Sequence, residues 1–222
     1  VTGSLLALLF SFVSLRDIIR APEENSSTVG IYEYSRPAFL SVLAILFIYS
    51  VDIILARMLF SENISGAYAI SSIAAKSIFW GTQPISRAMF SLSAEHSFDK
   101  KNSGNVLKNS LLVLIPIIVI ALGFLYFFPE FIINIFAGKI IDESVDILFY
   151  IGVGASFLSF ANMILLYKLS LGRIRGCRSL LLFALVEIAL LTYFSTDLLH
   201  FSLAFIMSTI LFLIGVIFLV RT

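Results

Sequence analysis

The feature that most constrains this chain is a series of apolar stretches long enough to cross a lipid bilayer. In the longest uninterrupted one, VLKNSLLVLIPIIVIALGFLYFF over residues 106–128, Lys108 is the single charge. A spanning helix needs about 20 apolar residues. The whole chain is 59% hydrophobic and 13% charged, whereas soluble domains are about 45–50% apolar and about 25% charged. The sequence therefore predicts an all-α, polytopic transmembrane helix bundle rather than a soluble helical protein.

We expect about six to seven spans, the first of them truncated. The segments are residues 1–15, 37–60, 66–94, 106–128, 146–169, 178–196 and 198–220. In domain terms, residues 1–20 are the end of a preceding helix, 21–36 a cytoplasmic linker and 37–222 a six-helix bundle. The first residues lack an initiator Met and the basic region that precedes a signal peptide's apolar core, which favours a cut end or an atypical start.

The distribution of basic residues predicts the orientation of these spans. With residues 16–36 placed in the cytoplasm, eleven of the fifteen lysines and arginines fall on cytoplasmic connections and Lys139 falls outside. Cytoplasmic loops of membrane proteins carry such an excess of basic residues. The remaining three, Arg57, Lys76 and Arg87, lie within the spans. We therefore expect a cell-membrane protein with lipids as its surroundings.

Several functions are disfavoured by what the sequence lacks. The connections between spans are too short for an enzymatic domain, and there is no glycine-rich nucleotide-binding loop. His96 and His200 are far apart in sequence, and Cys177 is the single cysteine. We expect no metal, no cofactor, no nucleic-acid partner and no catalytic residues.

Asp52 and Lys76 are the most informative charges, because a charge near the bilayer centre costs at least about 2.5–3.5 kcal/mol. They lie about twelve residues before and after the turn SENISG, centred near Asn63–Ile64. In an antiparallel helix pair this places both at similar depth, about 18 Å below the turn. Two interpretations follow: the two residues form an ion pair that locks the helices together, or both face one hydrated cavity whose wall they line.

The other polar groups within the spans have alternative interpretations. Arg57 is nearer the outer surface, where it snorkels or meets Glu62. Arg87 snorkels to lipid phosphates or reaches the cavity. Gln83, beside Pro84, fits either a kinked helix or a cavity ligand.

Two later helices carry further candidates. Glu187 lies near the middle of SLLLFALVEIALLTYF. It is either a hydrogen-bonded structural carboxyl or an ion-coupling group, and Asp52 is a second candidate for ion coupling. Asn162 shares a helix face with Ala155 and Ser159; such a stripe of small residues favours close helix packing, and Asn162 is also a candidate cavity residue.

Residues 36–90, RPAFLSVLAILFIYSVDIILARMLFSENISGAYAISSIAAKSIFWGTQPISRAMF, resemble the start of the second half of polysaccharide-biosynthesis (Wzx-like, O-antigen or capsule) flippases. These belong to the MATE-like multidrug, oligosaccharidyl-lipid and polysaccharide exporter superfamily. The similar elements are Pro37, Asp52, Gly66, Tyr68 and Pro84. A later stretch, FYIGVGASFLSFANMILLYKLSLGR, is similar to the family's tenth helix and the basic turn after it.

The resemblance implies one half of a two-bundle transporter that works by alternating access. The substrate would be an undecaprenyl-diphosphate-linked oligosaccharide, and the partner the missing N-terminal half or a second copy. Lys76 would then be the first candidate for contact with the diphosphate, followed by Arg57 and Arg87. Asp52 would orient Lys76.

Three alternatives remain open. A cation or drug antiporter of the same fold would use Asp52 and Glu187 for ion coupling. A membrane glycan polymerase would need a large external loop with catalytic Arg or His, whereas the longest one here carries only Lys139. The last is a structural membrane half-protein without transport activity.

Overall fold

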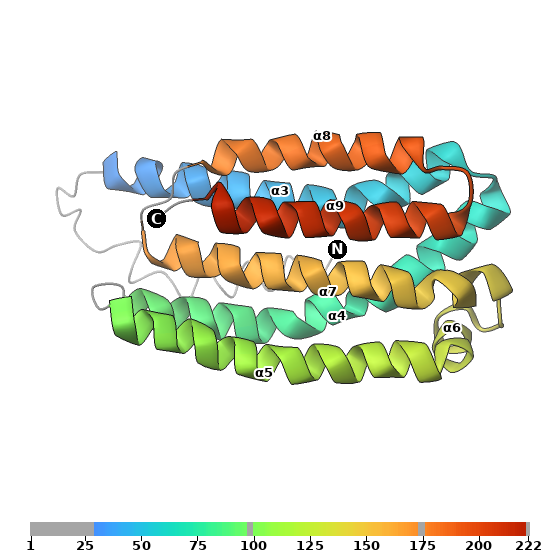
Figure 1. Ribbon diagram of the computed structural model, residues 1–222, viewed down its shortest axis with the longest axis horizontal. Helices are drawn as coiled ribbons and strands as arrows, with labels where there is room; N and C mark the ends of the chain where they lie inside the picture. The colour runs from blue at the N-terminus through green and yellow to red at the C-terminus, as the bar shows by residue number, and fades with distance from the viewer. Residues whose placement is uncertain (1–28, 97–99, 173–175, 221–222) are drawn as a thin grey trace, which may run out of the picture. The chain divides into compact units, whose positions relative to one another are not determined.

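A computed structural model of the 222-residue chain describes residues 29–96, 100–172 and 176–220, and this part of the chain is helical, with no strand. The chain divides into two parts after Glu33. The second part runs from Tyr34 onward, and the helix that leads into it begins at Val29. The helices are α3 (Val29–Leu59), α4 (Glu62–Glu95), α5 (Lys100–Phe127), α6 (Pro129–Ala137), α7 (Asp142–Ser170), α8 (Cys177–Tyr193) and α9 (Leu198–Phe218) (Figure 1).

Six of the seven expected segments correspond to helices. The segment 1–15 lies outside the described residues, as do residues 1–28 of the predicted domains. Helix α3 begins at Val29, so the last eight residues of the segment 21–36 are helical. The all-helical fold class is confirmed.

Within the described residues, four helices are long and apolar enough to cross a membrane. These stretches are Ser35–Leu59, Asn102–Phe127, Asp142–Ser170 and Leu198–Phe218. Helix α4 is long enough but rich in serine and other polar residues. The apolar part of α8, Ser179–Tyr193, is shorter than the others. The count of six to seven spans and the MATE-like half stay predictions.

Helix α6 was not predicted; residues 129–145 were interpreted as an external loop. Pro129 stands at the first turn of α6, where its missing N–H leaves no intrahelical bond unmade. Gly138 ends the helix with φ 70° and donates its N–H to the carbonyl of Asn134, a turn that favours glycine. The proline and glycine thus delimit a nine-residue helix between α5 and α7.

Close packing in the bundle centres on α4 and α7. Gly152, Gly154 and Ala155 on α7 are buried, and such small residues let helices approach closely. Two reciprocal hydrogen bonds join the pair: Ser144 Oγ donates to the carbonyl of Ala67 at 2.9 Å, and Ser71 Oγ donates to that of Ser144 at 2.8 Å. Helices α9 and α5 pack against α7 and α4 respectively.

Helix α3 is attached to the bundle by buried side chains. Ala44, Ile45 and Ile48 join a buried apolar cluster with residues of α7 and α9. Ala44 and Ala56 are fully buried, so α3 packs closely at these positions. Polar side chains of α3 and α4 also meet in the interior.

Candidate functional site

A fully buried ion pair joins Asp52 of α3 to Lys76 of α4. The Nζ atom of Lys76 lies 2.6 Å from Oδ1 and 2.7 Å from Oδ2 of Asp52, and it also donates to the carbonyl oxygen of Tyr49 at 2.6 Å. The three ammonium protons therefore match three acceptors. The predicted pairing of Asp52 with Lys76 is confirmed, whereas a role for the pair in transport stays a prediction.

Other side chains complete the surroundings of the pair. The hydroxyl of Tyr68 donates to Oδ2 of Asp52 at 2.7 Å, and Ser72 Oγ donates more weakly at 3.4 Å. The ring centroid of Phe205 on α9 lies 4.9 Å from Nζ of Lys76, within range of a cation–π interaction. A buried ion pair is tolerable only when its remaining hydrogen-bonding capacity is used in this way.

The turn before α4 differs from the one predicted. Helix α3 ends at Leu59 and α4 begins at Glu62, so the turn lies about three residues earlier than Asn63–Ile64. Asp52 is consequently closer to the turn than Lys76 is. The long side chain of Lys76 allows the pair to form despite this difference in register.

Glu187 of α8 is a second buried carboxyl near the pair. Its side chain is fully buried and interacts electrostatically with Asp52 and Lys76. Ser208 Oγ donates to Oε1 at 3.5 Å, and Oε2 has no hydrogen-bond partner among the described residues. Glu187 is thus brought to the Asp52–Lys76 pair, although more than a hundred residues separate it from either in sequence.

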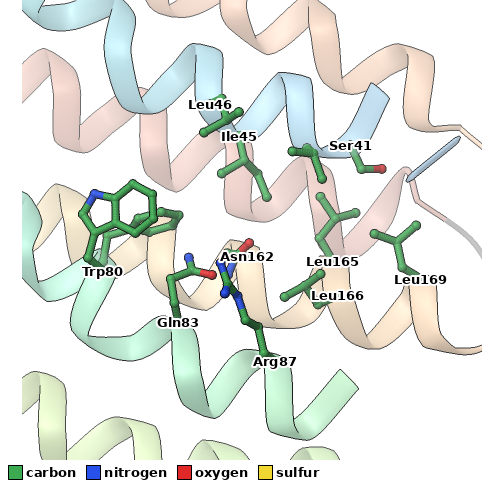
Figure 2. Close-up of a pocket in the computed structure, with 12 residues that line it drawn as sticks. Ser41, Ile45, Leu46, Trp80, Gln83, Arg87, Asn162, Leu165, Leu166 and Leu169 are labelled. Atoms are coloured by element: carbon green, nitrogen blue, oxygen red, sulfur yellow. The ribbon is translucent and has the colours of Figure 1, made fainter. Parts of the chain in front are cut away.

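A pocket of about 220 Å³ opens between α3, α4 and α7 (Figure 2). Its wall is largely apolar, with Ile45, Phe79 and Leu165 among the lining residues. Its polar lining residues are Ser41, Gln83, Arg87 and Asn162. Three of the predicted cavity residues therefore share one pocket.

The cationic group of the pocket is Arg87. Figure 2 shows the side chains of Gln83 and Arg87 extending from α4 toward Asn162 on α7. Arg87 is exposed and has no acidic partner within salt-bridge distance among the described residues. A guanidinium group beside two amides suits an anionic or hydroxyl-rich ligand group, and the surrounding leucines suit a hydrocarbon chain.

Tyr49 links the ion pair to the pocket. Its carbonyl oxygen accepts from Lys76, and its hydroxyl accepts from Nε1 of Trp80 at 2.8 Å. Trp80 lines the pocket, as does Phe79, whose ring centroid lies 5.3 Å from that of Tyr49. One residue of α3 thus contacts both polar sites.

Arg57 lies apart from both sites. Its Nη2 atom is 3.3 Å from Oε1 of Glu62, and the two side chains are 61% and 84% exposed. The predicted contact with Glu62 is confirmed, and Arg57 does not line the pocket. Lys76 is enclosed by its ion pair with Asp52. Of Arg57, Lys76 and Arg87, Arg87 is therefore the one that lines the pocket and has no acidic partner among the described residues.

The sequence carried a signal for the residues that were not predicted. Polar and aromatic side chains recur every three or four residues along α4, which is the spacing of one helix face. This series comprises Ser65, Tyr68, Ser72, Lys76, Trp80, Gln83 and Arg87. This spacing places Ser72 and Trp80 on the same helix face as Lys76 and Arg87. The contact from Tyr49 to Lys76 has no comparable sequence signal, because it is made by the backbone carbonyl of Tyr49.

In the part of the chain that the structure describes, the fold is all-helical, four helices are candidates to span a membrane, and a buried ion pair lies near a pocket that contains Arg87. Comparisons of the chain with protein-family models, curated proteins and solved structures give no match. The case for a function therefore rests on the residues themselves.

Proposed function

We propose that this chain is a multi-pass protein of the cytoplasmic membrane that forms one half of a MATE-like transporter. Its substrate is an undecaprenyl-diphosphate-linked oligosaccharide, which it moves between the two leaflets by alternating access. The other half is a preceding bundle of the same protein or a second copy. The sequence resemblance to polysaccharide flippases suggests this class.

The observation that carries the proposal is the pocket that contains Arg87. A diphosphate can leave the headgroup region only if its charge is compensated, and guanidinium groups bind phosphate oxygens through directed hydrogen bonds. Arg87 is free of acidic partners within the described chain, while Gln83 and Asn162 offer amides to the sugar hydroxyls. The apolar wall of the pocket accommodates part of the lipid chain.

The Asp52–Lys76 pair has a supporting part in this proposal. The pair is neutral as a whole, so it holds α3 to α4 without adding a competing charge to the pocket. Through Tyr49 it is connected to Trp80 in the pocket wall. Lys76 would then position the pocket and does not itself bind the diphosphate in this conformation.

A flipping assay in proteoliposomes tests the proposal. The probe is a short-chain polyprenyl diphosphate that carries a fluorescent disaccharide, and a membrane-impermeant reductant destroys the fluorescence of the outer leaflet. We expect the full chain to make nearly all of the probe reducible, and a phosphate-free polyprenyl glycoside to remain half protected. Arg87→Ala should slow the flipping at least tenfold, whereas Arg57→Ala, in the matched exposed arginine, should leave it unchanged.

Two results would overturn the proposal. One is equal flipping of the diphosphate probe and the phosphate-free probe. The other is an equal effect of Arg87→Ala and Arg57→Ala on the flipping rate. If the chain alone is inactive, the same variants are measured together with an added N-terminal bundle of a related transporter, and inactivity there as well rejects flipping.

A second candidate function, a cation-coupled exporter of the same architecture, is favoured by Glu187. Its Oε2 atom is buried without a partner in the described part of the chain, and its carboxyl interacts electrostatically with that of Asp52. Intramembrane carboxylates often serve in ion or proton relays. If the protein is a cation-coupled exporter, Glu187→Gln would abolish the stimulation of transport by an imposed cation or proton gradient. If it is a flippase for the diphosphate-linked lipid, Glu187→Gln would leave passive flipping of the diphosphate probe unchanged.

A further inference from the structure

Helix α6 presents three chemically different faces. Phe131, Ile135 and Phe136 are 60%, 64% and 50% exposed, and Ile133 is fully buried against the bundle. Glu130 and Asn134 are exposed on another face. At about 100° per residue, the mean direction of these two polar residues lies about 130° from that of the exposed apolar residues, of which Phe131 is about 60° from Asn134. Helix α6 is thus amphipathic even where it does not touch the rest of the protein.

The orientation of α6 differs from that of the long helices. In Figure 1, α6 is seen nearly along its own axis, while α5 and α7 run across the view. It packs against α4, α5 and α7, at the end of the bundle where α5 ends at Phe127 and α7 begins at Asp142. If α5 and α7 cross a membrane, α6 lies in the plane of its surface.

The surroundings of α6 also fit a membrane surface. Phe127 and Phe128 are 73% and 53% exposed next to its first turn, and Tyr126 is 62% exposed. Tyrosine is enriched at the boundary between headgroups and hydrocarbon, and phenylalanine is common on the apolar face of helices that lie at that boundary. Nine residues span only about 13 Å, too short to cross a hydrocarbon core of about 30 Å.

We propose that α6 is an interfacial helix whose exposed apolar face, formed by Phe131, Ile135 and Phe136, inserts into the headgroup–acyl boundary of one leaflet. The partner is the phospholipid surface, because the polar side of α6 faces away from the apolar side as it does in helices that lie on membranes. The inference rests on the membrane insertion included in the proposed function and is independent of transport activity.

Site-directed spin labelling of the full chain in proteoliposomes tests this placement. Cys177 is replaced by serine, and single labels are introduced with Phe131→Cys and Ile135→Cys on the apolar face or Glu130→Cys and Asn134→Cys on the polar face. Oxygen partitions into the bilayer, whereas a nickel chelate stays in water. We expect the first two labels to collide several-fold more with oxygen than with the chelate, and the last two to show the reverse.

A label at Val119→Cys, an exposed position of α5, separates the possible failures. If the label at Val119 lies in hydrocarbon and all four α6 labels are exposed to water, the interfacial placement of α6 is wrong, although the protein is still inserted in the membrane. Four α6 labels in hydrocarbon would overturn it too. Water exposure at Val119 would reject membrane insertion, and with it the proposed function. Dipolar broadening between labels at Phe131→Cys would show that a second copy covers this face, contrary to the proposal.

Discussion

Nζ of Lys76 lies 2.6 Å from Oδ1 of Asp52, and neither side chain is accessible to solvent. Removal of one member leaves the other charge buried without compensation, which costs about 3–5 kcal/mol. We therefore expect Lys76→Met to lower the free energy of unfolding in detergent–lipid micelles by about that amount. Adding Asp52→Asn should recover a large part of the loss, because both charges are then gone.

The exposed pair Arg57–Glu62 on the same two helices is the matched control for this cycle. Exposed ion pairs contribute about 0–1 kcal/mol, so the coupling energy between Arg57→Ala and Glu62→Ala should be small. Equal coupling energies for the two pairs, measured by the same unfolding assay, would refute the assignment of Asp52–Lys76 as a strongly coupled buried pair.

Lys168 of α7 is predicted to hold the end of α9. Its Nζ atom donates to the carbonyl oxygens of Val216, Ile217 and Val220 at 2.8, 2.7 and 2.6 Å. The last carbonyls of a helix lack intrahelical partners, so Lys168→Met should lower stability by about 1–3 kcal/mol. Lys108→Met, in an exposed lysine, should change the unfolding free energy by less than about 0.5 kcal/mol; similar losses would contradict this role.

Gly154 of α7 is predicted to be intolerant of a side chain. A Cβ atom there would lie 2.6 Å from Cδ1 of Phe205, which is fully buried and covers the Lys76 ammonium group. Gly154→Ala should therefore destabilise the protein by about 1–3 kcal/mol. Gly123→Ala, where no atom lies within 4 Å of the added Cβ, should be neutral or stabilising by up to about 1 kcal/mol. Thermal unfolding measures the two variants, and a lower unfolding temperature for Gly123→Ala than for Gly154→Ala would exclude this packing.

Asp197 caps the N-terminus of α9. Its Oδ1 atom accepts from the backbone N–H of His200 at 2.7 Å, and the His200 imidazole Nδ1 lies 2.9 Å from both carboxylate oxygens. Asp197→Ala should lower stability by about 1 kcal/mol, as is typical for the loss of such a cap. Asp197→Asn should retain most of it, because asparagine also caps helices well.

The same contacts make this contribution pH-dependent. The backbone hydrogen bond from His200, followed by the hydrogen bond from its side chain, lowers the pKa of Asp197 from its ordinary value of 3.8. Because the pKa is lower in the folded state, the stabilisation is complete above about pH 4 and is lost as the pH falls through the lowered pKa. A comparison of wild-type and Asp197→Asn unfolding between pH 2 and 6 measures this loss, and parallel pH profiles would rule it out.

The helical fold was accessible from the sequence because long apolar stretches leave few alternatives. The ion pair between Asp52 and Lys76 was also accessible, since charges in such stretches require partners. Helix α6 was missed because its nine residues are bounded by a proline and a glycine, the usual marks of a loop. The approach of Glu187 to the pair depends on how α8 packs against α9, and no local pattern encodes that arrangement.

The site residues were predicted unequally for a related reason. Arg87, Gln83 and Asn162 were identified one at a time as polar residues in apolar surroundings, but their shared pocket depends on how α3, α4 and α7 pack together. The backbone carbonyl of Tyr49 is an acceptor for Lys76 whatever residue occupies that position. Only three-dimensional packing selects it.

The close packing of α7 has a consequence for which substitutions the chain tolerates. On α7, a single added methyl group at Gly152 or Gly154 meets a neighbouring side chain, so variation there is confined to the smallest residues. Residues of α5 such as Leu112, Val119 and Ile120 are exposed, and changes of size there meet no neighbour. Evolutionary drift in this protein should therefore be slow along the glycine-bearing face of α7 and faster along the exposed face of α5.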